Sequence, residues 1–263
     1  MYEELILRCS GREKLGTLLF IHGFGGSYRD NASAKELAEY FDYYAINLPG
    51  HGEADLPYFD SSLEEYARYI ADYIEMRDLQ NLMLVGHSLG GGAVCVAEKF
   101  VRNRLAGLVL ANPIASSIYE TPGIKKIFFP TNLEEMIELC RFAYYDFDRM
   151  AQAEGFMQAC AFSLEVQRRK EPYLQGLFDA AYSGKTLESV KTAQRTLETE
   201  TLYIFGRYDR IVPMQDPGAS IPGNPCIKFC VFEHSGHCPH NEEPHRFAAE
   251  IYAFARNVFS KKR

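Results

Sequence analysis

The chain has 263 residues, of which 47% are hydrophobic, so it can fill the core of one large α/β domain, with or without an inserted segment. Its formal net charge is −7, and the charged residues are scattered along the chain. This distribution argues against a nucleic-acid-binding protein and against an anionic-membrane surface.

Cysteine usage and hydropathy indicate a cytoplasmic protein. The seven cysteines are irregularly spaced and include no C-x-x-C pair, so they predict neither a disulfide framework nor a zinc framework. No apolar stretch approaches the ~18 residues of a membrane-spanning helix. We therefore expect no integral membrane association, and the oligomeric state is open between a monomer and a homodimer.

The first part of the chain predicts alternating strands and helices. Apolar runs at 5–7 and 17–21 predict two strands with no helix between them, so the sheet is expected to begin antiparallel. Helical periodicity and buried-strand runs then alternate, with helices at 34–41 and 63–74 and strands at 44–48, 82–86 and 105–110. Strands separated by such helices pair in parallel, which indicates a doubly wound, mostly parallel α/β sheet.

The alternation stops from about 113 to 199. Residues 133–145 and 156–167 have helical periodicity, aromatic side chains are dense, and no strand is predicted in the segment. A helical insertion between two strands of the sheet explains this pattern.

Strands resume at 201–205 and 227–232, and a final amphipathic helix closes the chain. We therefore divide the sequence into an α/β core, residues 1–112 and 200–263, and an inserted helical cap, residues 113–199.

The segment around Ser88 carries the clearest functional signal. An apolar strand ends at Gly86, the motif Gly86-His87-Ser88-Leu89-Gly90 follows, and a helix-compatible stretch begins at once. This is the G-x-S-x-G nucleophile elbow in its expected context, a sharp turn from strand to helix that exposes a strained serine. Ser88 is therefore the predicted nucleophile; an ordinary N-cap serine in a glycine-rich turn is the alternative.

A serine nucleophile needs a base and a group that orients the base. Asp209 and His237 supply them, because each follows the end of a predicted strand, where an open α/β sheet gathers its catalytic groups. Asn112, at another strand end, cannot carry the charge of the acid. His234 and His240 compete with His237, which is preferred because it lies in a glycine-flanked loop after a strand.

The oxyanion of a tetrahedral intermediate needs two backbone donors, one after the nucleophile and one in the loop after an early strand. The sequence predicts the N–H groups of Leu89 and Phe24 for this role, the latter in the glycine-rich loop 22–27.

Other residues give no signal for a metal or a cofactor. His22, His51 and His87 precede or lie within glycine turns at spacings that fit no metal site, and are predicted to pack against those turns. No G-x-G-x-x-G follows a strand in the right register, so a dinucleotide site is not expected. Among the cysteines, Cys238 is notable because it directly follows the candidate catalytic histidine.

Five motif blocks in this order resemble the α/β-hydrolase fold superfamily, in its cap-bearing branch of serine hydrolases. They are HGFGG at 22–26, LPGHG at 48–52, GHSLGG at 86–91, GRYD at 206–209 and GHCP at 236–239, the last followed by Glu243-Pro244 and Phe247. The resemblance covers nearly the whole chain and implies the same triad, Ser88, Asp209 and His237.

The cap is the least diagnostic segment. Residues 130–136 and 142–146 are similar to caps of monoacylglycerol-lipase-like esterases and of meta-cleavage-product C–C hydrolases. Serine at the elbow argues against haloalkane dehalogenases and epoxide hydrolases. We expect a cofactor-independent serine hydrolase that cleaves carboxylic esters of small or medium apolar acyl groups; the alternatives are a C–C bond hydrolase and a non-catalytic ligand-binding receptor.

Overall fold

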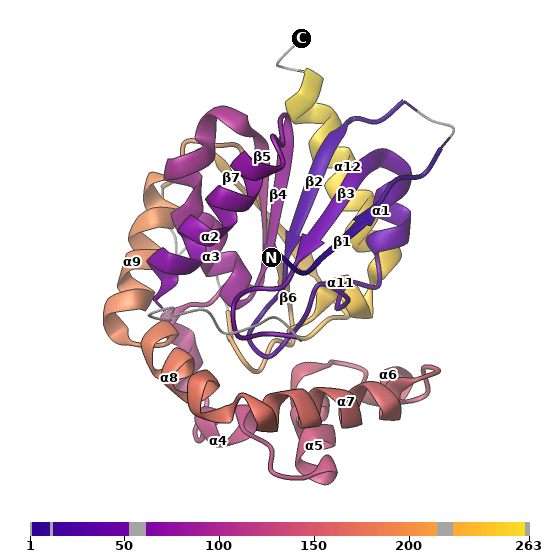
Figure 1. The fold of residues 1–263 in the computed structure, drawn as a ribbon, viewed down its shortest axis with the longest axis vertical. Coiled ribbons are helices and arrows are strands. Elements are labelled where there is room, and N and C mark those ends of the chain that lie inside the picture. The colour runs from indigo at the N-terminus through magenta and orange to yellow at the C-terminus, as the bar shows by residue number, and fades with distance from the viewer. Residues whose placement is uncertain (1, 11–12, 53–61, 215–222, 261–263) are drawn as a thin grey trace.

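One sheet organises the molecule. The computed structural model describes residues 2–10, 13–52, 62–214 and 223–260. Seven strands form a sheet in the order β1-β3-β2-β4-β5-β6-β7 (Figure 1), and all neighbours are parallel except β1 and β3. The strands are β1 (Glu4–Leu7), β2 (Gly16–Ile21), β3 (Phe41–Ile46), β4 (Leu82–His87), β5 (Leu105–Ala111), β6 (Thr201–Gly206) and β7 (Ile227–Phe232).

The predicted antiparallel start is present, but its partner differs from the expected one. β1 pairs with β3, because β2 already has β3 on one side and β4 on the other. The third strand also begins earlier than predicted. α1 (Ala34–Tyr40) ends at Tyr40, and Phe41 has extended φ and ψ, so the chain passes directly from helix to strand without a loop.

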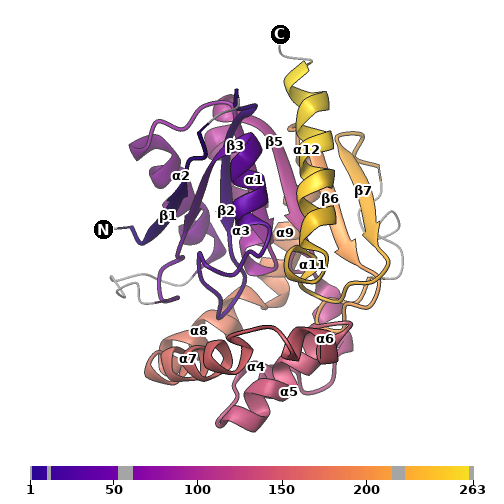
Figure 2. The same cartoon turned by 90° about the vertical axis from the view of Figure 1, so that its right-hand side faces the viewer.

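Helices cover both faces of the sheet (Figure 2), as expected for a doubly wound fold. α2 (Leu63–Met76), α3 (Leu89–Val101) and α9 (Gly184–Thr196) lie on one face, and α1 and α12 (Pro244–Ser260) on the other.

β2 shows why each strand needs both layers. Its alternate side chains enter different cores, Leu19 and Ile21 on the face of α2 and α3, and Leu18 and Phe20 on the face of α12. The strand is therefore continuously apolar from Leu18 to Ile21 rather than alternating.

The segment between β5 and β6, which lies wholly within the described residues, contains helices joined by loops and no strand, and the predicted helices are present as α5 and α7. After a 3₁₀ turn (Ser116–Glu120) come α4 (Ile124–Phe128), α5 (Leu133–Ala143), α6 (Phe147–Ala151), α7 (Phe156–Arg169), α8 (Glu171–Ala181) and α9. α4 to α8 lie beyond the carboxyl end of the strands, whereas α9 returns beside α3 (Figures 1 and 2). The division between cap and core at residues 113 and 199 remains a prediction.

Two short elements complete the fold: a 3₁₀ turn (Arg102–Arg104) before β5, and α11 (Pro239–Glu242) before α12. In the part of the chain that the structure describes, no helix combines the length and apolarity needed to cross a bilayer.

Candidate active site

Ser88 occupies a strained turn between β4 and α3. Its φ of 51° and ψ of −116° lie outside the regions that L-residues ordinarily adopt. A Cβ on Gly86 would lie 2.5 Å from the carbonyl oxygen of Gly90, and one on Gly90 would lie 2.4 Å from that of His22. Both flanking positions therefore require glycine, for the steric reason that the motif implies.

The structure brings the three predicted residues together in one chain of hydrogen bonds. The Ser88 hydroxyl lies 2.9 Å from Nε2 of His237, and Nδ1 of His237 lies 2.8 Å from Oδ2 of Asp209. All three residues are buried. In this arrangement the hydroxyl donates to Nε2 and the Nδ1–H donates to the carboxylate, which is the proton path that an activated serine needs.

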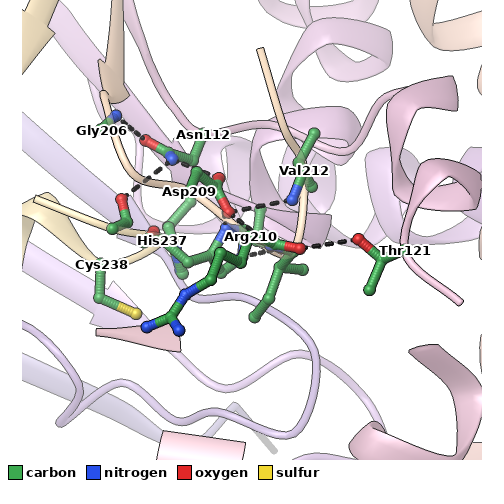
Figure 3. A network of polar contacts seen from close by, with 12 residues as sticks. Asn112, Thr121, Gly206, Asp209, Arg210, Val212, His237 and Cys238 are labelled. Carbon is green, nitrogen blue, oxygen red and sulfur yellow. Dashed lines mark hydrogen bonds and ion pairs between the residues drawn. The ribbon is translucent and has the colours of Figure 1, made fainter. Parts of the chain in front are cut away.

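Asp209 is fixed by hydrogen bonds on both carboxylate oxygens (Figure 3). Oδ1 accepts from the backbone N–H groups of Ile211 at 2.8 Å and Val212 at 2.9 Å, while Oδ2 accepts from Asn112 and His237. Burial raises the pKa of Asp209, but the attraction of His237 and these hydrogen bonds outweigh it and lower the pKa overall. The carboxylate is therefore ionised at neutral pH.

Asn112 is a site residue whose part the sequence does not reveal. Its side-chain oxygen accepts from the N–H of Gly206 at 3.1 Å, and its amide nitrogen donates to Asp209 and, at 3.3 Å, to the carbonyl of Gly236. One carboxamide thus joins the loops that carry the acid and the histidine (Figure 3). The sequence signal for this role is an asparagine at the end of a predicted strand, a residue type that tolerates the positive φ found there.

Glu242 is the second residue that sequence reasoning missed. Its carboxylate is fully buried and accepts the N–H groups of Gly236 at 2.8 Å and Cys238 at 3.3 Å, on either side of His237. It also accepts the N–H of Tyr145 at 2.6 Å. Burial raises the pKa of Glu242 despite these donors. An acidic residue shortly after the histidine was the available signal.

The last turn of α5 contacts the loops that carry both His237 and Asp209. The backbone N–H of His237 donates to the carbonyl of Ala143 at 2.7 Å. Arg210, next to Asp209, donates to the carbonyls of Arg141 at 2.8 Å and Tyr144 at 2.9 Å. These contacts hold the end of α5 against the triad.

The predicted oxyanion donors lie beside the nucleophile. A Cβ on Gly23 would lie 3.0 Å from the Cβ of Ser88, so the loop that contains Phe24 passes directly over the serine. Leu89 begins α3. Within the described ranges, neither the Phe24 nor the Leu89 backbone N–H donates a hydrogen bond, which leaves both available to a substrate oxygen.

Aromatic rings from the inserted helices surround Phe24. Its ring centroid lies 5.5 Å from that of Phe128, 5.9 Å from Phe129, 5.6 Å from Phe178 and 6.4 Å from Tyr182. Burial raises the pKa of Tyr182, and an interaction with the Ser88 hydroxyl offsets part of this rise. In the described structure the Tyr182 hydroxyl makes no hydrogen bond of normal geometry.

The three histidines expected to pack against glycine turns, His22, His51 and His87, all contact turn residues. His22 accepts the N–H of Leu48 at 3.0 Å, and its ring centroid lies 5.1 Å from that of His51. His87 packs against Gly23, but its ring also lies 4.4 Å from that of His240 and 4.9 Å from that of His237. His87 therefore also contacts two histidines from the far end of the chain, which sequence spacing did not indicate.

Fold and site define one class of protein. A model of the alpha/beta hydrolase family matches residues 18–250, and the chain belongs to this family. The membership and fold inferred from the motif blocks are thereby confirmed.

Relatives and solved structures agree with this assignment. A Mycoplasma pneumoniae protein named "Putative esterase/lipase 1" is 25% identical over 249 residues, which cover 92% of this chain and 92% of that protein. A second protein of the same organism, "Putative esterase/lipase 2", is 28% identical over 264 residues, which cover 95% of this chain and 92% of that protein. A meta-cleavage product hydrolase from Pseudomonas fluorescens IP01 superposes with a TM-score of 0.79 at 19% identity, over 98% of this chain and 94% of that one. At that identity the likeness shows the fold alone.

Proposed function

We propose that the protein is a serine hydrolase that cleaves carboxylic esters of small or medium apolar acyl groups. The observation that carries this proposal is the hydrogen-bonded series Ser88–His237–Asp209. Near Ser88, the N–H groups of Phe24 and Leu89 donate to no other group in the described part of the chain. The activity needs no cofactor, because nucleophile, base, acid and oxyanion donors all come from the chain.

In the proposed reaction, Ser88 Oγ attacks the ester carbonyl carbon while Nε2 of His237 takes the hydroxyl proton. The carbonyl oxygen becomes an oxyanion, which accepts hydrogen bonds from Phe24 and Leu89. The intermediate expels the alkoxide, which receives the proton from His237, and an acyl-enzyme remains. Water, deprotonated by His237, then attacks the acyl carbon. The second tetrahedral intermediate breaks its bond to Ser88 Oγ, which takes the proton back from His237, and the acid is released.

The names of the Mycoplasma relatives support an ester as the substrate. A C–C bond hydrolase with the same triad is the alternative, since the neighbouring solved structure carries that name, but its low identity supports only the fold. A receptor without turnover is disfavoured by the intact series of hydrogen bonds.

We further propose that residues 113–199 act as a cap over a core formed by residues 1–112 and 200–263. The aromatic rings around Phe24 support an apolar acyl pocket under this cap. Seven free thiols support a cytoplasmic location. We expect a small-molecule substrate; sedimentation distinguishes a monomer from a homodimer.

Covalent labelling tests the proposal. A fluorophosphonate should modify folded protein at Ser88, as mapped by peptide mass spectrometry, and the Ser88→Ala variant should remain unlabelled. A panel of nitrophenyl esters, thioesters and dienone C–C substrates then separates the alternatives. If labelled protein turns over only the dienones, the ester hypothesis is replaced by that of a C–C bond hydrolase. If folded protein forms no adduct at Ser88, the proposal of a serine hydrolase is overturned.

A further inference from the structure

Beside the triad, three side chains of the kinds that bind transition metals converge. His87 ends β4, whereas Cys238 and His240 follow His237 at the far end of the chain. Each residue offers one ligand atom, and the two ring nitrogens and the thiol sulfur all lie within 4.8 Å of one another. Imidazole nitrogen and thiolate sulfur are ligands that Zn²⁺ prefers.

His240, one of the three, has an unsatisfied ring nitrogen. Its ring is 1% exposed, and in the described structure its Nδ1 has no hydrogen-bond partner. A buried ring nitrogen without a hydrogen-bond partner has a lone pair to offer when it carries no proton, and a metal ion can then bind it.

His87 is held in a single tautomer. Its Nε2 lies 2.8 Å from the carbonyl oxygen of His237, and since a carbonyl can only accept, Nε2 carries the hydrogen and Nδ1 a lone pair. Metal-bound histidines commonly donate their second nitrogen to a backbone carbonyl in this way.

We propose that His87, Cys238 and His240 form a binding site for Zn²⁺ that inhibits the hydrolase. Zinc bonds of about 2.0–2.1 Å to nitrogen and about 2.3 Å to sulfur place tetrahedral ligand atoms roughly 3.5 Å apart, so the side chains must close in by about 1 Å. The thiol of Cys238 releases its proton to solvent as the zinc–sulfur bond forms. The metal stays divalent, and water completes the tetrahedron.

Inhibition follows from the position of His237. This residue precedes Cys238 and accepts from His87 through its carbonyl, so movement of both ligands toward zinc displaces the ring from its 2.9 Å contact with Ser88. This second half of the inference rests on the proposed function, whereas metal binding does not.

Spectroscopic titration tests the binding. Co²⁺ added to the full-length protein should produce a thiolate-to-cobalt charge-transfer band that saturates at one ion per chain, and Zn²⁺ should displace it. Cys238→Ala should abolish the band, and His240→Gln should weaken zinc binding at least tenfold in calorimetry. Circular dichroism and metal-free fluorophosphonate labelling verify that each variant is folded.

Cys140→Ala is the matched control. The thiols of Cys140 and Cys160 lie 3.8 Å apart on α5 and α7 and form the rival soft-ligand pair. This variant should keep the band and the zinc affinity. No band in the wild type, or a band lost in Cys140→Ala but kept in Cys238→Ala, would overturn the site. Zinc that binds at Cys238 yet leaves the labelling rate of Ser88 unchanged would overturn the inhibition.

Discussion

The carboxamide of Asn112 donates a hydrogen bond to the same carboxylate oxygen of Asp209 that faces His237. These two residues follow the neighbouring strands β5 and β6, so the acid is held from the adjacent strand as well as by its own loop.

Asn112→Ala should move the acid limb of the activity profile to higher pH. The amide is one of the donors that lower the pKa of Asp209, so its loss raises that pKa, and the carboxylate becomes protonated earlier as the pH falls. At neutral pH, kcat/KM should fall about 10- to 100-fold, as for a lost hydrogen bond to a charged group. Profiles of kcat/KM against pH measure both effects.

Asn224→Ala is the control for Asn112→Ala. Asn224 donates to carbonyls of Gln194 and Leu197 before β7, at the opposite end of the sheet from the triad. Its loss should leave the pH profile in place. An unchanged acid limb in Asn112→Ala would show that the amide does not tune Asp209.

Ser88→Ala and His237→Ala should each reduce ester turnover by a factor on the order of 10⁴ to 10⁶, and the double variant should lose little more. The two groups act on a single proton, so the second change removes nothing that the first has left. Steady-state kinetics with a nitrophenyl ester measure this. Multiplicative losses in the double variant would contradict a shared proton.

Gly90→Ala should destabilise the fold by about 1–3 kcal/mol or more, because the new methyl group meets the carbonyl oxygens of His22 and Ile21. Gly176→Ala is the matched change in α8, where nothing lies within 4 Å of the Cβ position, and it should stabilise by about 0.5–1 kcal/mol. Urea unfolding of both variants measures the difference. A neutral Gly90→Ala would mean that the elbow can relax.

Lengthening the acyl chain of a nitrophenyl ester should raise kcat/KM several-fold per carbon, since each buried methylene contributes up to ~0.8 kcal/mol, until the pocket is full. Phe178→Leu should shift the optimum toward longer chains, because this ring packs against Phe24 and Phe128.

Rates below and above the solubility limit of the substrate distinguish an enzyme with a closed pocket from an enzyme that acts at an interface. Activity confined to aggregated substrate would contradict the closed pocket.

Tyr182→Phe should lower kcat/KM for an ester about tenfold and leave the matching thioester nearly unchanged. Among the residues that the structure describes, the hydroxyl has no hydrogen-bond partner of normal geometry and lies near Ser88. It can therefore donate to the leaving-group oxygen of an ester, whereas sulfur is a weak acceptor. Tyr203→Phe removes another buried, unpartnered hydroxyl, in β6, and should change neither rate. Equal losses on ester and thioester would assign Tyr182 a packing role only.

Residues with a local signature could be placed from the sequence. Ser88, Asp209 and His237 each follow a predicted strand, and the parallel sheet brings such positions to one edge. Phe24 and Leu89 are likewise set by their distance from a strand end.

Residues that act through distant contacts could not be placed in this way. Glu242 accepts from Tyr145, which is 97 positions away, and Tyr182 faces Ser88 only because α8 crosses the end of the sheet. The same limit explains His87, whose neighbours Cys238 and His240 are brought to it by the packing of α11 rather than by sequence spacing.

The contacts of the last turn of α5 restrict how the proposed cap, residues 113–199, can move. A lid on a free hinge can swing away and leave the catalytic groups intact, but here Ala143 and Tyr144 accept hydrogen bonds from the very loops that hold His237 and Asp209. Lifting this end of α5 would therefore dismantle the triad. We therefore expect substrate to enter without displacing this end of α5, so that His237 and Asp209 keep their positions during each catalytic cycle.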